Sequence, residues 1–177
     1  MKFFFTSDTH FGQERTLNLS KRPFQTVEEM DKVLIENWNK TVSKDDFVFH
    51  LGDFGDYNRV KELNGSIVLV AGNYEWEMTK EKALEYGFYG FSPFKEECTI
   101  SINEYHVAMV HRPQDLKNRN ISDYNLNLFG HVHKLQMIKE YGVNVGSDCH
   151  NYTPIDFDTI LFYHDAILHY FDDDALR

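Results

Sequence analysis

The sequence predicts an α/β fold in which two mixed β-sheets pack as a sandwich with helices on the outside. In the first half of the chain, short apolar runs alternate with segments of helical periodicity, whereas the second half contains consecutive apolar runs separated by turn residues. The chain has 177 residues, of which 42 % are hydrophobic and 15 % aromatic. This length and composition predict a single domain over residues 1–177 with a substantial core.

The first half is expected to contain three buried strands and three helices. The strands are the short apolar runs Lys2–Ser7, Phe47–Leu51 and Ser66–Ala71. Apolar residues at helical spacing predict a helix that begins after Thr26, where Thr26 and Glu29 have the spacing of a capping box. Two shorter helices are expected at Asn58–Leu63 and Thr79–Tyr86.

The second half is expected to be richer in strands. The apolar runs that predict them are Cys98–Ile102, Tyr105–Val110, Leu126–Phe129, Gln136–Lys139 and Val143–Val145. Asp156 is the expected N-cap of a final helix that extends to His169. We interpret Phe162, Tyr163 and Tyr170 as packing residues of this helix.

Charge and cysteine content limit the classes of partner. The net charge of −10 disfavours binding to long nucleic-acid duplexes, including a nuclease role on such duplexes. No apolar run approaches the roughly 20 residues that span a bilayer, so no membrane partner is expected. Cys98 and Cys149 lack metal-finger spacing, and a reduced cytoplasm is the expected location. The sequence leaves the oligomeric state open.

Residues of the types that can bind metal ions follow most of the predicted strands. They occur in the order Asp8-Thr9-His10, Gly52-Asp53, Gly72-Asn73, His111 and Gly130-His131-Val132-His133. Because ligands gather at the carboxyl ends of strands in such folds, we expect these side chains at one edge of a sheet. The predicted ligands are Asp8, His10, Asp53, Asn73, His111, His131 and His133.

This ligand set predicts a centre of two divalent cations. The Asp53 carboxylate has two oxygens and suits a bridge between cations roughly 3.5–4 Å apart, an arrangement that acts on phosphate esters. Asp8 and His10 can converge on one ion, whereas His131 and His133 need not share an ion if the backbone turns between them. Imidazole and carboxylate ligands together suit Mn, Fe, Zn, Co or Ni.

The ordered motif set resembles that of the calcineurin-like metallophosphoesterase superfamily. The segments Phe5–Gly12, Thr26–Asp31 and Asn144–Asp148 resemble its small bacterial and phage branch. The resemblance implies two divalent ions, with Mn²⁺ favoured, and a hydroxide bridging both. One ion would be held by Asp8, His10, Asp53 and His133, and the other by Asp53, Asn73, His111 and His131. The implied substrate is a small phosphate ester, with nucleotides or short oligonucleotides as candidates.

One position departs from the family pattern, because Tyr74 follows Asn73 where the family usually has His. Tyrosine has a reference pKa near 10 and is a poor proton donor at neutral pH. We therefore expect metal-activated hydroxide to hydrolyse phosphodiesters and other substrates with good leaving groups. The residues expected to take part in catalysis are Asp53, Asn73, His111 and Tyr74. The alternative is a non-catalytic metal-binding scaffold that recognises another protein.

Further polar residues are candidates for supporting roles. Arg112, beside His111, and Arg22 are candidates for binding substrate phosphate oxygens, and the alternative for each is a solvated loop cation, which the sequence favours for Arg22. Asp148 is expected to orient a ligand histidine. His50 lies inside an apolar run and alternates away from Asp53, so we expect it to be packed rather than to bind metal.

Overall fold

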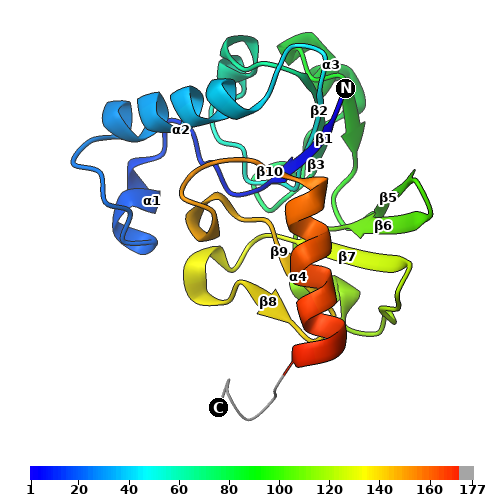
Figure 1. The fold of residues 1–177 in the computed structure, drawn as a ribbon. Helices are drawn as coiled ribbons and strands as arrows, with labels where there is room; N and C mark the ends of the chain where they lie inside the picture. Colours follow the sequence, from blue (N-terminus) through cyan, green and yellow to red (C-terminus); the bar gives the residue numbers. More distant parts are fainter. Residues whose placement is uncertain (172–177) are drawn as a thin grey trace.

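The computed structural model describes residues 1–171 and contains two five-stranded mixed sheets (Figure 1). The first sheet has the order β10-β1-β2-β3-β4. Its strands are β1 (Phe3–Thr6), β2 (Phe47–His50), β3 (Ser66–Val70), β4 (Gly90–Ser92) and β10 (Ile155–Asp156). Strands β1 to β4 are parallel and β10 is antiparallel to β1. The carboxyl ends of β1, β2 and β3 therefore lie at one edge.

The second sheet has the order β5-β6-β7-β9-β8. Its strands are β5 (Cys98–Ile102), β6 (Tyr105–Met109), β7 (Asn125–Phe129), β8 (Ile138–Lys139) and β9 (Gly142–Asn144). The three central strands β6, β7 and β9 are parallel, and both outer strands are antiparallel to their neighbours. An isolated parallel bridge between Ser7 and Gly146 connects the first sheet to the loop after β9.

The two sheets pack through one shared hydrophobic core. Alternate side chains of the first sheet, including Phe5 and Val70, meet Met109 and Leu128 of the second sheet. Helix α4 (Phe157–Tyr170) packs against the same core and lies beside β9 (Figure 1). Because apolar side chains alternate along strands, each sheet can face this core while its other face packs elsewhere.

Helices cover the other face of the first sheet. Helix α2 (Val27–Thr41) presents Met30, Leu34 and Trp38 to this second core, and α3 (Lys80–Tyr86) contributes Ala83. The Thr26 side chain accepts the Glu29 N–H, as the capping-box spacing predicted. The remaining helices are α1 (Glu14–Leu19) and the short 3₁₀ segments η1 (Tyr57–Glu62), η2 (Pro113–Leu116), η3 (His133–Leu135) and η4 (Ser147–Cys149). The predicted sandwich of two mixed sheets with flanking helices is confirmed.

Several local predictions need correction. Strands β4 and β10 and helix α1 were not predicted, and the helix expected at Asn58–Leu63 is the 3₁₀ segment η1. The strand expected from Gln136 begins only at Ile138, because η3 occupies the residues immediately before Gln136. No helix within residues 1–171 is long and apolar enough to cross a membrane.

The packing role predicted for the aromatic residues of α4 is wrong for two of the three. Phe162 and Tyr170 are 70 % and 79 % exposed, and only Tyr163 packs partly against the core. The buried face of α4 instead carries Ile160, His164 and Ile167. These residues have the spacing of one helical face, which turns Phe162 and Tyr170 towards solvent.

Replacing Asp156 by Ala should lower the free energy of unfolding by about 1 kcal/mol at pH 7, because α4 loses its N-cap. The Asp156 carboxylate accepts from the Thr159 N–H at 3.0 Å and from the Thr159 hydroxyl at 2.6 Å. The hydrogen bond from Thr159 lowers the pKa of Asp156 below its usual 3.8. Its contribution is therefore present above pH 3.8 and is lost as the pH falls through the lower, folded-state pKa.

Urea unfolding at pH 7 and at pH 3 measures this difference. Asp156→Asn is the matched control, because Asn retains the accepting oxygen without the titrating charge. It should stay within a few tenths of a kcal/mol of the wild type at pH 7. A loss of stability from Asp156→Ala that does not shrink at low pH would argue against a capping carboxylate.

Candidate metal centre

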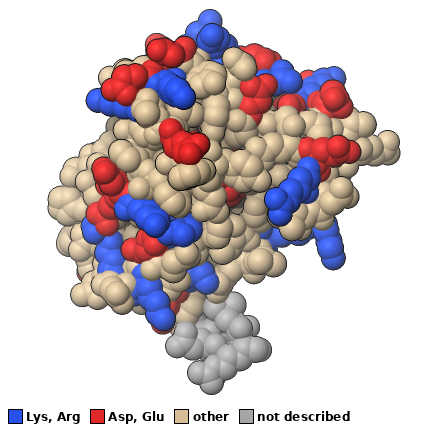
Figure 2. All heavy atoms as spheres, turned by 180° about the vertical axis from the view of Figure 1, so that it is seen from behind, with Lys and Arg blue, Asp and Glu red and all other residues tan. Residues whose placement is uncertain are grey.

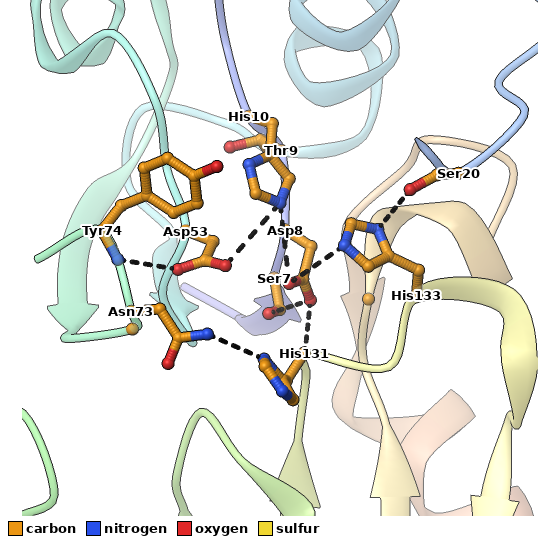
Figure 3. A network of polar contacts seen from close by, with 12 residues as sticks. Ser7, Asp8, Thr9, His10, Ser20, Asp53, Asn73, Tyr74, His131 and His133 are labelled. Atoms are coloured by element: carbon orange, nitrogen blue, oxygen red, sulfur yellow. Dashed lines mark hydrogen bonds and ion pairs between the residues drawn. The ribbon is translucent and has the colours of Figure 1, made fainter. Parts of the chain in front are cut away.

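Loops at the carboxyl ends of five strands bring the predicted ligands together (Figure 3). They follow β1, β2 and β3 in the first sheet and β6 and β7 in the second. Two groups form, one of Asp8, His10 and His133 and the other of Asp53, His111 and His131. Within each group the potential ligand atoms lie within 4.8 Å of one another. The backbone does turn between His131 and His133, since they belong to different groups.

Asp53 lies between the two groups. Its Oδ2 is 3.4 Å from His111 Nε2 and 3.8 Å from His10 Nε2, and its Oδ1 accepts the Tyr74 N–H. Burial disfavours the charge, but the hydrogen bond with His111 and the imidazoles of His111 and His10 lower the pKa of the Asp53 carboxyl to about 2. The carboxylate is therefore ionised at neutral pH and faces both groups.

Two buried atoms show that these residues fit metal ions. Among the described residues, Asp8 Oδ1 and His10 Nε2 are buried without a hydrogen-bond partner, and they lie 3.9 Å apart. A buried carboxylate oxygen without a partner costs several kcal/mol or a pKa shift, so such atoms are rare in folded proteins. A divalent cation between them would satisfy both atoms. The other Asp8 oxygen, Oδ2, accepts from Ser7 Oγ and from the His131 N–H.

Neighbouring groups fix the orientation of three ligand imidazoles. The Nδ1 atoms of His10, His111 and His133 lie 2.7 Å from Gln13 Oε1, the Leu51 carbonyl and Asp148 Oδ2, respectively. Each of these oxygens accepts the Nδ1–H, which directs Nε2 towards the carboxylates of Asp8 and Asp53, where it could bind a cation. Asp148 lies beside His133, as the sequence interpretation expected.

Glycines allow the ligand loops to approach one another. A Cβ on Gly52 would overlap the backbone of Gly72, and a Cβ on Gly130 would overlap the Ser7 hydroxyl. Gly52 also has φ of +87°, which favours glycine. These contacts explain why the ligand motifs after β2 and β7 begin with glycine.

Comparisons with known proteins agree with this geometry. The profile of the calcineurin-like phosphoesterase superfamily domain matches residues 1–164. The chain belongs to this superfamily. It is 31 % identical over 180 residues to an uncharacterized protein of Methanocaldococcus jannaschii, covering 90 % of this chain and 89 % of that protein.

Solved structures also share the fold. A protein of unknown function from Aquifex aeolicus aligns with a TM-score of 0.67 and 25 % identity over 90 % of this chain and 97 % of that chain. A structure described as a novel archaeal phosphodiesterase aligns with a TM-score of 0.53 and 20 % identity over 90 % of this chain and 96 % of that chain. The superfamily and the two ligand groups support a metal-dependent phosphoesterase that uses divalent ions.

Asn73 and Tyr74 lie at the mouth of the centre. Asn73 Nδ2 is 3.1 Å from His131 Nδ1, so the amide reaches the second ligand group. The Tyr74 ring is about half exposed and contacts the His10 ring edge-on, with centroids 5.3 Å apart. Both residues line a cleft of about 330 Å³. Arg15, which was not among the predicted site residues, lines the same cleft from α1.

The two arginines predicted to bind phosphate have different environments. Arg22 needs correction, because its side chain is fully buried. Its guanidinium donates to both oxygens of Asp148 and to the carbonyls of Asp8 and Thr9, which leaves it unable to reach substrate. Arg22 instead positions Asp148, which orients His133. Arg112 is partly exposed, forms an ion pair with Asp115 at 3.3 Å and stays a predicted phosphate contact.

Glu75 supports the centre in a way that the sequence reading missed. Its buried carboxylate accepts the N–H groups of Asp53, Phe54 and Gly72 at 2.8–2.9 Å. One side chain thereby joins the loops after β2 and β3, which carry Asp53 and Asn73. The only sequence signal for this role was an acidic residue two positions after Asn73.

Replacing Glu75 by Gln should weaken binding of Mn²⁺ by about 10- to 100-fold and lower the free energy of unfolding by about 2 kcal/mol. The amide would turn one NH₂ group towards backbone N–H donors that now have an accepting oxygen. Calorimetric Mn²⁺ titration and urea unfolding measure the two effects. Glu77→Gln is the matched control, because Glu77 is an exposed neighbour. Equal behaviour of the two variants would show that the Glu75 contacts do not hold the loops.

Proposed function

We propose that this phosphoesterase hydrolyses phosphodiesters and other phosphate esters with good leaving groups at a centre of two divalent cations, with Mn²⁺ preferred. The observation that carries the proposal is the position of Asp53 between two ligand groups, one of which contains the unpartnered atoms of Asp8 and His10. An intact ligand set of this kind favours an enzyme over a scaffold that has lost its activity.

In this proposal both sheets contribute residues to the binding of each ion. Asp8, His10 and His133 would hold one ion, and Asn73, His111 and His131 the other, with Asp53 shared. When bound, two divalent cations polarise phosphoryl oxygens and lower the pKa of water from 15.7 towards about 7. Asn73 and His111 are proposed to orient the phosphate, and Arg112 is proposed to contact it from beside His111.

The leaving group is proposed to depart past Tyr74. This ring lies next to His10 at the mouth of the cleft, where the superfamily pattern usually has a histidine. A phenol is a weaker acid than an imidazolium and gives up its proton poorly at pH 7, so an alcohol would have to leave largely as its anion. Esters of acidic alcohols are therefore the favoured substrates.

The surface charge agrees with a small substrate. On the face shown in Figure 2, basic side chains are interspersed with acidic ones and form no broad basic surface. Long duplexes are bound through many Lys and Arg contacts to phosphates, which this face does not offer. We propose a small phosphate ester as the substrate, with nucleotides and short oligonucleotides within the class.

Replacing Asp53 by Asn should lower turnover of bis-p-nitrophenyl phosphate by at least about 100-fold in Mn²⁺, because the shared carboxylate loses a charge and an accepting oxygen. Release of p-nitrophenolate measures this, and p-nitrophenyl phosphate assayed in parallel gives the ratio of diesterase to monoesterase activity. Asp165→Asn, on the exposed face of α4, is the control and should retain wild-type rates. A wild-type protein that binds two ions but hydrolyses neither ester with any candidate metal would favour the scaffold alternative.

Replacing Tyr74 by His should raise turnover of esters with poor leaving groups by at least about tenfold, because an imidazole can donate a proton near pH 7. A series of aryl methyl phosphates with increasing phenol pKa measures this effect. The wild-type rate should fall steeply along the series, and the rate of Tyr74→His should fall less. Tyr74→Phe is the control and should follow the wild type. A wild-type rate independent of leaving-group pKa would contradict the proposed role of Tyr74.

A further inference from the structure

A groove of about 490 Å³ adjoins the metal centre. It lies between the C-terminal end of α1, at residues 19–21, and the loop of residues 131–135. Leu19, His131 and His133 line both this groove and the cleft that contains Asp53. The two hollows therefore adjoin one another, and a molecule bound through its phosphate at the metal centre could extend into the groove.

The groove has exposed apolar walls. Leu19 and Leu135 are 67 % and 87 % exposed, and neither belongs to a hydrophobic core cluster of the described residues. Exposed apolar side chains gathered beside a polar site are typical of ligand-binding surfaces. The position of the two leucines next to ligand histidines points to a ligand that also reaches those histidines.

Basic groups line the same groove. The Lys134 ammonium donates to the Lys21 carbonyl at 3.2 Å, and Ser20 Oγ lies 3.1 Å from His133 Nδ1. These contacts join the wall formed by residues 19–21 to the wall formed by residues 131–135. Arg15 lines the adjoining cleft. In a chain with a net charge of −10, two lysines on the groove and an arginine on the adjoining cleft favour an anionic ligand with an apolar part.

The groove lies on the side of His10 away from Tyr74. The His133 ring stacks on the His10 ring with centroids 5.2 Å apart, and Figure 3 shows Tyr74 and His133 on opposite sides of His10. A diester at the centre has two ester groups. If one departs past Tyr74, the group that stays on phosphorus lies roughly at right angles to the departing one, and the groove beside His133 is open to receive it.

We propose that this groove binds an apolar, aryl-sized ester group that remains on phosphorus during hydrolysis of a phosphodiester, with Lys21 and Lys134 attracting the anion. The assignment rests on the proposed function for the placement of the phosphate. It predicts a preference for diesters over monoesters, because a monoester has no retained group to fill the groove.

Two diesters with the same leaving group test the assignment. Phenyl p-nitrophenyl phosphate and methyl p-nitrophenyl phosphate differ only in the retained group. Leu135→Ser and Leu19→Ser should lower kcat/KM about tenfold more for the phenyl diester than for the methyl diester, chiefly through KM. Each variant is compared with the wild type on one substrate at a time, so intrinsic reactivity cancels. Leu84→Ser, which changes an exposed leucine on α3, should leave both substrates unaffected. Equal losses for the two diesters overturn the proposal.

A binding measurement separates failure of the groove from failure of the proposed function. Diphenyl phosphate and dimethyl phosphate are titrated calorimetrically into Mn²⁺-loaded wild-type and Leu135→Ser proteins. Diphenyl phosphate that binds at least about tenfold more tightly, with the advantage lost in Leu135→Ser, supports the groove even if no p-nitrophenyl ester is hydrolysed. In that case the proposed function alone fails. Equal affinity for the two phosphates, or an advantage that Leu135→Ser does not change, overturns the groove whatever the turnover.

Discussion

The buried carboxylate of Asp8 joins the two sheets at the edge where the ligands gather. Asp8 Oδ2 accepts the N–H of His131, which follows β7. The backbone N–H of Asp8 donates to the carbonyl of Gly52, which follows β2. The backbone carbonyl of Asp8 accepts from the guanidinium of Arg22 and from the hydroxyl of Ser147. A charge buried this deeply needs compensation on every side, and the protein groups provide it everywhere except at Oδ1. The arrangement of the surrounding loops follows from that need.

Five of the candidate ligands also have unusual backbone conformations. Asp8, His10, Asp53, His131 and His133 have φ between +49° and +72°, a region that costs L-residues about 1–3 kcal/mol each. Backbone hydrogen bonds such as that from the His10 N–H to the Asp53 carbonyl hold this conformation. The conformation turns each side chain sharply off the end of its strand, so short loops can aim several ligands into one small space.

Most of the strands and the grouping of the candidate ligands could be predicted because both depend on local sequence. Buried parallel strands are short apolar runs, and the candidate metal-binding residues directly follow them. Contacts distant in sequence were not predictable. Arg22 belongs to a segment, Lys-Arg-Pro-Phe, that is typical of a solvated loop. Its burial depends on the contact with Asp148, which lies 126 residues further along the chain. The contact between Glu75 and Asp53 spans 22 residues and likewise depends on the placement of β2 beside β3.

Each ligand group takes residues from both sheets: Asp8 and His10 meet His133, and Asp53 meets His111 and His131. A bound ion would therefore act as a cross-link between the layers of the sandwich, much as a disulfide does between two chain segments. Because a ligand that binds only the folded state stabilises it by mass action, resistance to proteolysis would depend on the free metal concentration. Metal supply would then set how much of this protein a cell retains, as well as how active each molecule is.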